Sequence, residues 1–433
     1  MSTGPLAGVR IVDLTRLGYG AEATQLCGAM GAEVIRIESR TRPDPIRMMP
    51  PFVPLPGEHV AAEPGITATT VREKGFNRGG IFYKYNGGGK RSVAINLKDP
   101  RGMDVLRRLI AKADVVTGSF SAGAMARMGL PYDELRRIRA DIIYVSMSGF
   151  GHHGRDAAHV TLGPTAQALT GLTYLVGLPD RRPAGWSFSY LDHMGGYLGA
   201  YAILAALHHR HRTGEGQHVD VSQIEPGIPL AGPAALDRQA NGRRYRRAGT
   251  PPGNRSPEPP RAPHGAYRAA GDDAWIAIGC RDDEDWRRLR AAMGDPAWAR
   301  EPRFDTVAGR RLHEDELDAA IEAWTRGHDR YALADRLSAA GIPAAPVQDA
   351  RDRVERDPQL RARGYFVPLR HSETGEWPQE RPPFRLSRSD VHPGGTIRRG
   401  PPCLGEDTHE VLRRLLGMED AEIAGLEDAG VLT

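Results

Sequence analysis

The longest apolar helix that this chain can form, over the uncharged residues 194–207, strongly limits how the sequence can fold. It reads MGGYLGAYAILAAL, which predicts a helix with apolar side chains on every face. Such a helix is buried in a protein core, and Gly195, Gly196 and Gly199 allow neighbouring elements to pack very close to it. Because about fourteen uncharged residues are too few to cross a bilayer, we expect a central core helix and no membrane partner.

Asp192 stands at the N-terminal mouth of this helix. The partial positive charge and the unpaired N–H groups of a helix N-terminus favour the ionised form of a carboxyl group placed there. One interpretation is that Asp192 is only the N-cap of the helix, a position where Asp is common. The other is that it is a reactive carboxylate at the edge of a core, and the helix alone leaves both open.

The composition is that of an ordinary soluble globular protein, with 40% hydrophobic and 26% charged residues. A length of 433 residues predicts two domains. The 58 cationic residues nearly balance the 54 acidic ones and form no long block, so we expect no nucleic-acid partner.

The cysteines and histidines indicate the compartment and argue against a metal site. Cys27, Cys280 and Cys403 are odd in number and far apart, as in proteins of a reducing compartment. The first residues lack the basic and apolar regions of a secretory signal, so we expect a cytoplasmic protein. The histidines of residues 208–211 lack the carboxylate or cysteine neighbours of a metal site, and we expect no bound metal.

Short apolar strands alternate with helices in the N-terminal half of the chain. Strands are expected at residues 9–14, 33–38, 92–97, 114–117 and 142–146. This alternation predicts an α/β fold with a Rossmann-like, mostly parallel sheet, whose ligands bind at the carboxyl ends of the strands. The turn after the first strand, residues 17–22, lacks G-x-G-x-x-G spacing and is a weak nucleotide motif. Its backbone N–H groups remain suited to a phosphate or thioester.

The secondary structure expected from the sequence changes after the first 235 residues. We expect a large α/β domain over residues 1–235 and a linker or mobile loop, rich in Gly, Pro and Arg, over residues 236–264. A smaller α+β domain is expected over residues 265–350. The C-terminal segment, residues 351–433, is expected to return to the large domain.

Six segments occur in an order that is typical of one known family. They read PLAGVRIVDLT (residues 5–15), GAEVIRIE (31–38), KRSVAINLK (90–98), SMSGFG (146–151), AALHHRHRTGEGQ (205–217) and LGEDT (404–408). As an ordered set they resemble the class III CoA-transferase family, which includes the formyl-CoA and carnitine CoA-transferases. The resemblance covers nearly the whole chain.

The resemblance implies a function for Asp192, which stands where the family has its catalytic aspartate, just before a Gly-containing apolar helix. It implies that Asp192 attacks an acyl-CoA thioester, giving a mixed aspartyl anhydride and free CoA thiolate, and that a carboxylic acid acceptor completes the exchange. CoA is then a substrate, with no tightly bound cofactor. We further expect the N–H groups of the Gly18-Tyr19-Gly20 turn to stabilise the oxyanion. An interlocked homodimer is also implied.

The resemblance also implies which residues bind CoA. They are Leu17, Gly18 and Tyr19 at the thiol end, Phe120 beside the pantetheine with Ile95 as an apolar neighbour, and Arg40, Lys98 and Arg127 near the nucleotide. Glu22 and Trp186 are further candidates for the site.

The chain departs from the family pattern at several positions. The usual Asn-Phe-x-Pro-Gly motif is SFSAG at residues 119–123, so a side-chain amide near CoA is missing. Gly163 stands where the family often has an acidic residue, and Leu162 stands where racemases and epimerases of the superfamily have a His.

Two other functions stay open beside CoA transfer. One is an acyl-CoA epimerase or isomerase with Asp192 as general base, and the other is a catalytically silent CoA-binding subunit. The missing His–acid pair at residues 162–163 argues against the epimerase, and the presence of Asp192 argues against the silent subunit. We therefore expect a CoA-transferase.

Overall fold

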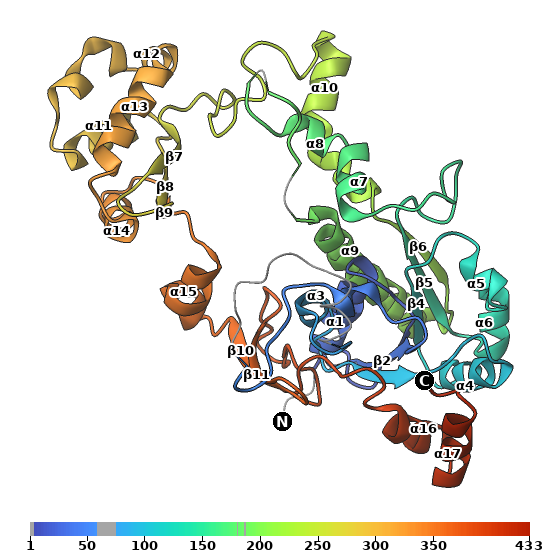
Figure 1. Ribbon diagram of the computed structural model, residues 1–433. Helices are drawn as coiled ribbons and strands as arrows, with labels where there is room; N and C mark the ends of the chain where they lie inside the picture. The colour runs from blue at the N-terminus through green and yellow to red at the C-terminus, as the bar shows by residue number, and fades with distance from the viewer. Residues whose placement is uncertain (1–3, 59–74, 180, 186–187) are drawn as a thin grey trace. The chain divides into compact units, whose positions relative to one another are not determined.

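A computed structural model describes residues 4–58, 75–179, 181–185 and 188–433 (Figure 1). Trp186, a candidate for the site, lies outside the described residues. The chain forms two compact units. The first contains residues 1–173, 185–233 and 359–433, and the second contains residues 174–184 and 234–358.

The second unit is larger than the small domain expected at residues 265–350. It also takes in residues 236–264, where a linker was expected, residues 174–184 and 234–235, which the sequence assigned to the large domain, and residues 351–358 of the expected C-terminal segment. Segments 236–264 and 174–184 bind each other, since Arg246 Nη1 donates a hydrogen bond to the carbonyl of Tyr174 at 3.0 Å. Such a contact between distant segments leaves no signal in the local sequence.

The first unit is built on a six-stranded parallel sheet, which confirms the prediction of a mostly parallel sheet. The strands are β1 (Arg10–Asp13), β2 (Glu33–Glu38), β3 (Arg91–Ala94), β4 (Val115–Gly118), β5 (Ile143–Ser148) and β6 (His218–Ser222). Their order is β3-β2-β1-β4-β5-β6. The order reverses between β1 and β4, and ligands of doubly wound sheets bind at the carboxyl ends of the strands beside such a switch point.

Helices and a hairpin complete the first unit. The helices are α1 (Tyr19–Ala29), α3 (Gly80–Tyr85), α4 (Pro100–Ile110), α5 (Ala124–Arg127), α6 (Tyr132–Ile138), α7 (Gly163–Leu169), α9 (Tyr190–Thr213), α16 (Thr408–Leu416) and α17 (Asp420–Asp428). The hairpin pairs β10 (Phe366–His371) with β11 (Gly375–Glu380). No helix of the described ranges is both long and apolar enough to span a membrane.

The second unit contains a three-stranded antiparallel sheet with helices around it. Its strands are β7 (His264–Arg268), β8 (Trp275–Gly279) and β9 (Ala344–Pro346). Its main helices are α11 (Asp283–Ala292), α12 (Val307–Leu312), α13 (Glu314–Thr325) and α14 (Arg330–Ala339). Three further helices, α8 (Leu172–Leu175), α10 (Gly232–Asn241) and α15 (Pro358–Ala362), lie where the chain passes from one unit to the other.

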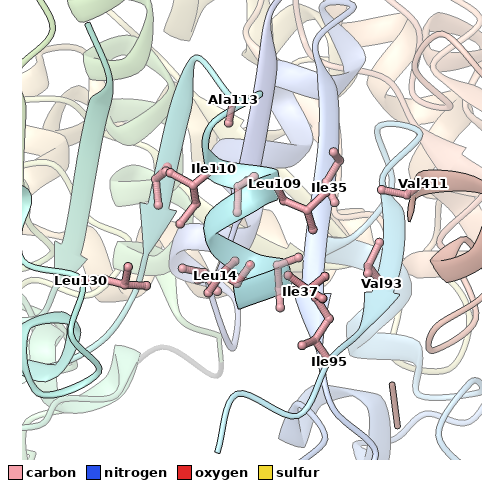
Figure 2. Packing of buried hydrophobic residues seen from close by; sticks show 14 of the residues in the cluster. Leu14, Ile35, Ile37, Val93, Ile95, Leu109, Ile110, Ala113, Leu130 and Val411 are labelled. Atoms are coloured by element: carbon pink, nitrogen blue, oxygen red, sulfur yellow. The ribbon is translucent and has the colours of Figure 1, made fainter. Parts of the chain in front are cut away.

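Neighbouring residues of each strand point to opposite faces of the parallel sheet. Both faces are buried, because a separate hydrophobic cluster covers each of them. Val12 and Ile35 belong to one hydrophobic cluster, with α4, α6, α16 and α17. Figure 2 shows this cluster, with Ile35, Ile37, Val93 and Ile95 packed against Leu109 and Val411. Ile11 and Val34 belong to the opposite cluster, with α1 and α9.

The contact between α1 and α9 depends on glycines. A Cβ atom at Gly195 would lie 2.1 Å from Cε2 of Tyr19, and one at Gly199 would lie 2.3 Å from Cε of Met147. Real Cβ atoms do not approach other atoms so closely. The bare backbone of α9 therefore lies directly against α1, as the sequence predicts.

The expectation that α9 is buried on every side is wrong for the single chain. Three large side chains of the helix are exposed: Tyr197 by 43%, Leu198 by 39% and Tyr201 by 69%. The first unit covers the glycine face of α9 and leaves this opposite face open. Both faces of α9 are uncharged, so the absence of charge did not show which face the first unit would leave exposed.

A buried ion pair anchors α1 to the end of β1. Lys90 Nζ lies 3.2 Å from Asp13 Oδ2 and donates a hydrogen bond to the carbonyl of Ala21 at 2.8 Å. Burial lowers the pKa of Lys90 to about 8, although the charge on Asp13 opposes this shift. The carboxyl end of β1 and the first turn of α1 are thus held together beneath the candidate site.

We predict that Gly195→Ala lowers the free energy of unfolding by about 1–3 kcal/mol, the usual result of overpacking a core. The added methyl group would collide with the Tyr19 ring and push α1 from α9. Urea unfolding followed by circular dichroism measures the change. Gly425→Ala in α17 is the matched control, because nothing lies within 4 Å of the added methyl group. Equal stability of the two variants would contradict this account of the packing.

Candidate active site

A cavity of about 610 Å³ in the first unit lies at the carboxyl ends of β1, β4, β5 and β6. Asp192 lines it, together with Leu17, Gly18 and Tyr19 from the start of α1. The sequence analysis expected these four positions at the reacting end of CoA, and the structure brings them to one cavity. All residues that line it belong to the first unit.

Asp192 lies in the first turn of α9 and is not its N-cap. The helix begins at Tyr190, and Ser189 occupies the N-cap position. Gln223, just after the end of β6, donates a hydrogen bond from Nε2 to Asp192 Oδ1, and the side chain of Ser189 also bonds to this carboxylate. The carboxylate is therefore held by side chains that precede and follow the helix in the sequence.

Burial raises the pKa of Asp192 above its usual value. The bonds from Ser189 and Gln223 and the neighbouring His193 act in the opposite direction, and Glu22 adds to the upward shift. We expected the helix terminus to favour the ionised carboxylate, but the loss of water around the group has the larger effect. A poorly solvated carboxylate is a stronger nucleophile or base than one in water.

Gly163, at the start of α7, is required by the packing around Asp192. A Cβ atom there would lie 2.2 Å from Ser189 Oγ and 3.1 Å from Asp192 Oδ2. The space next to the carboxylate is therefore filled by Ser189. The acidic residue that the family often has at this position does not fit this arrangement.

The turn between β1 and α1 carries two features that bear on its proposed role. Leu17 has a φ of +62°, and its N–H donates to Asp44 Oδ2 at 3.1 Å. Since α1 begins at Tyr19, the N–H groups of its first turn have no acceptor within the helix. The hydroxyl of Tyr19 donates to the carbonyl of Val221 at 3.1 Å, and burial raises its pKa, so this phenol stays neutral.

A second cavity, about 300 Å³, adjoins the first along the ends of β1, β2 and β3. Ile95 and Lys98 line it, while Arg16 and Phe120 line both cavities. The two cavities therefore meet at Arg16 and Phe120.

Two of the expected CoA-binding residues are not part of the lining of either described cavity. Arg40 and Arg127 are exposed, and neither is among the residues that line the two described cavities. Arg40 Nη2 donates to the carbonyl of Leu404 at 3.3 Å, and Arg127 is the last residue of α5.

Ser119 connects the loops that follow β1 and β4, the two strands at the switch point, through hydrogen bonds. Its Oγ accepts a hydrogen bond from the N–H of Arg16 at 2.7 Å and donates one to the carbonyl of the same residue at 3.0 Å. The serine that replaces the family's asparagine thus joins the loop after β4 to the loop after β1.

Several cavity residues were not identified from the sequence. Gln223 follows β6 directly, so its place at the carboxyl end of a strand was a usable signal. His193 and Tyr85 gave no such signal. Glu22, which was named from the sequence without a role, is not among the residues that line the described cavity. Among the described residues, no group of three or more His, Cys, Asp or Glu side chains is arranged to hold a metal ion.

Comparison with known proteins identifies the class of this enzyme. The family described as CoA-transferase family III matches residues 6–408, which confirms the resemblance found in the sequence. The chain belongs to this family and is an enzyme of the class III CoA-transferase type.

Two relatives and one solved structure match over nearly their full length. The chain is 30% identical to the succinyl-CoA–D-citramalate CoA-transferase of Chloroflexus aurantiacus, covering 99% of this chain and 98% of the relative. It is also 30% identical to the succinate–glutarate CoA-transferase of Agrobacterium fabrum, covering 96% of each. A crystal structure of a CAIB/BAIF family protein from Brucella suis is 29% identical, with a TM-score of 0.81 over 96% of this chain and all of that one.

Proposed function

We propose that the protein transfers CoA from an acyl-CoA thioester to a carboxylic acid, with Asp192 as the nucleophile. The observation that carries this proposal is the Asp192 carboxylate, which lines the 610 Å³ cavity and is held by Gln223 and Ser189. A fixed, poorly solvated carboxylate beside a cavity is suited to attack on a carbonyl carbon.

In the first step an oxygen of Asp192 forms a bond to the thioester carbonyl carbon. The carbon–sulfur bond then breaks, and the electron pair leaves with sulfur as CoA thiolate, giving a mixed anhydride. The thiolate attacks the aspartyl carbonyl, which releases the first acid and leaves an aspartyl-CoA thioester. The acceptor carboxylate and CoA pass through the same two steps in reverse order. The N–H groups at the start of α1, which have no acceptor within the helix, support an oxyanion at each stage.

The two adjoining cavities suggest how CoA binds. The acyl and thiol end would occupy the larger cavity, beside Leu17, Gly18 and Tyr19, and the pantetheine would pass Phe120 into the smaller one. Lys98 and Ile95 line that smaller cavity. Arg40 and Arg127 are exposed, and we propose that they act on the phosphates at the outer end of CoA.

The relatives suggest the acids involved. Succinate, citramalate and glutarate, named in two of them, are all dicarboxylic acids. We propose that a dicarboxylic acid is either donor or acceptor here.

Experiment can distinguish CoA transfer from the two alternative functions, an acyl-CoA epimerase and a catalytically silent subunit. A raised pKa for Asp192 is also suited to a general base that removes an α-proton. An epimerase would bring solvent deuterium into the acyl α-carbon without exchanging CoA. A silent subunit would bind CoA and show neither reaction.

We predict that Asp192→Asn lowers kcat by at least about a thousandfold, since the nucleophile of a covalent mechanism has no substitute. In the wild-type enzyme, acyl-CoA with hydroxylamine should leave a hydroxamate on Asp192 that mass spectrometry detects. The exposed Asp133→Asn on α6 is the control and should keep full activity. Turnover by the wild-type enzyme without any Asp192 adduct would contradict the anhydride mechanism.

The raised pKa of Asp192 predicts the acid side of the pH profile. Because the ionised carboxylate reacts, kcat/KM should fall with decreasing pH at a midpoint above 3.8, the usual value for Asp. Gln223→Leu removes a hydrogen bond to the ionised form, which raises the pKa further and moves the midpoint to higher pH. The exposed Gln239→Ala should leave the midpoint unchanged. A downward shift in Gln223→Leu would refute this account.

We propose an interlocked homodimer in which a second copy covers the exposed face of α9. The apolar side chains Tyr197, Leu198 and Tyr201 support this, since a large exposed apolar surface is typical of an interface. The chain passes between its two units at residues 173–174, 184–185, 233–234 and 358–359, so each unit is built from more than one segment.

The dimer has a direct test. The wild-type protein should sediment with twice the mass of one chain, and Tyr201→Arg should shift the equilibrium toward the monomer because it places a charge in the apolar face. Leu312→Arg, on an exposed apolar residue of α12, is the matched control and should stay dimeric. A stable wild-type monomer would rule the dimer out.

A further inference from the structure

Three side chains from three different elements form a hydrogen-bonded row beside Asp192. Glu22 of α1 lies 2.7 Å from His193, measured from Oε2 to Nδ1. The other ring nitrogen of His193, on α9, lies 3.3 Å from the hydroxyl of Tyr85, the last residue of α3. The rings of Tyr85 and His193 are stacked, with centroids 5.5 Å apart.

The row faces the cavity that contains Asp192. Tyr85, His193 and Asp192 all line that cavity. His193 follows Asp192 directly on α9, and the negative charge of Asp192 acts on the phenol of Tyr85. The row therefore reaches the place where the acyl group would react.

Two glycines make this row possible. A Cβ atom at Gly196 would lie 2.8 Å from Cβ of Glu22, so only glycine lets Glu22 lie against α9. A Cβ atom at Gly18 would lie 2.9 Å from Cζ of Tyr85, so the phenol end of this ring lies against the β1–α1 turn. Close backbone packing fixes both ends of the row.

The hydrogen-bonding groups define the directions in the row. An ionised Glu22 only accepts, so Nδ1 of His193 donates to it. When Nε2 of His193 also donates, to the oxygen of Tyr85, the Tyr85 hydroxyl hydrogen is free to point at an acceptor in the cavity.

Tyr85 stays protonated in this environment. Burial, together with the negative charges of Asp192 and Glu22, raises its pKa above the usual range. It is thus a neutral donor throughout the working pH range, close to where negative charge develops. Preorganised donors of this kind stabilise oxyanions strongly in sites that exclude water.

We propose that Tyr85 is a catalytic residue that donates a hydrogen bond to the thioester carbonyl oxygen as Asp192 attacks, and that His193 and Glu22 are positioning residues that hold it. This inference rests on the proposed CoA transfer. The Asp192 oxygen bonds to the carbonyl carbon, the oxyanion accepts the bond from Tyr85, and the electron pair leaves with sulfur. The Tyr85 proton stays on its own oxygen.

The test is the rate of Asp192 adduct formation in a single turnover. Tyr85→Phe keeps the ring and should slow adduct formation about a hundredfold, the usual effect of losing one oxyanion donor, with KM for acyl-CoA nearly unchanged. Tyr83→Phe on the same helix is the matched control. The Tyr83 hydroxyl is 2.6 Å from Thr374 Oγ1 and is not among the groups that line the described cavity. This control should react at the wild-type rate even if it is less stable.

The positioning role has its own measurement. His193→Ala and Glu22→Gln should each slow adduct formation when Tyr85 is present, and neither should slow it further in the Tyr85→Phe background, because residues that act as a unit are not additive. Fully additive effects would overturn the positioning role. If Tyr85→Phe fails to fold, the rate of adduct formation in His193→Ala tests the role of the same hydrogen-bonded row.

The outcomes separate this inference from the proposed function. If the wild-type enzyme forms an Asp192 adduct and Tyr85→Phe forms it equally fast, the role of Tyr85 is wrong and CoA transfer through Asp192 stands. If the wild-type enzyme turns over without an adduct, the proposed function itself fails. CoA binding by each variant shows that the fold is retained.

Discussion

The close approach of α1 and α9 is the constraint on which the rest of the site depends. Gly195, Gly196 and Gly199 bring the backbone of α9 against Tyr19, Glu22 and the sheet. This contact places the first turn of α9, with Asp192, opposite the first turn of α1. With larger side chains at these positions, Asp192 and the first turn of α1 would separate. Packing and chemistry therefore depend on the same glycines.

The strand order explains why two cavities adjoin at this point. The sheet reverses direction between β1 and β4, so the loops after these strands diverge and leave space between them. Ser119 limits how far they diverge because it bonds twice to the backbone of Arg16. Arg16 and Phe120 line both cavities. A ligand bound in one cavity therefore contacts side chains that also line the other.

The sheet and part of the site could be predicted from the sequence, for identifiable reasons. Each strand is a short apolar run between helices, and the segment before α9 places Asp192 at a helix start, so local patterns were sufficient. The row of Glu22, His193 and Tyr85 could not be predicted, because it joins residues far apart in the chain. The second unit's segment 174–184 was missed for the same reason.

Gly163 and Ser189 share one small volume beside Asp192, and this has an evolutionary consequence. A Cβ atom at position 163 would overlap the Ser189 side chain, with a separation of 2.2 Å from its Oγ. A larger residue at 163 therefore requires a smaller one at 189, whereas a smaller residue at 189 leaves Gly163 in place. In any line of descent from this chain, a side chain at 163 can follow only after position 189 has lost volume.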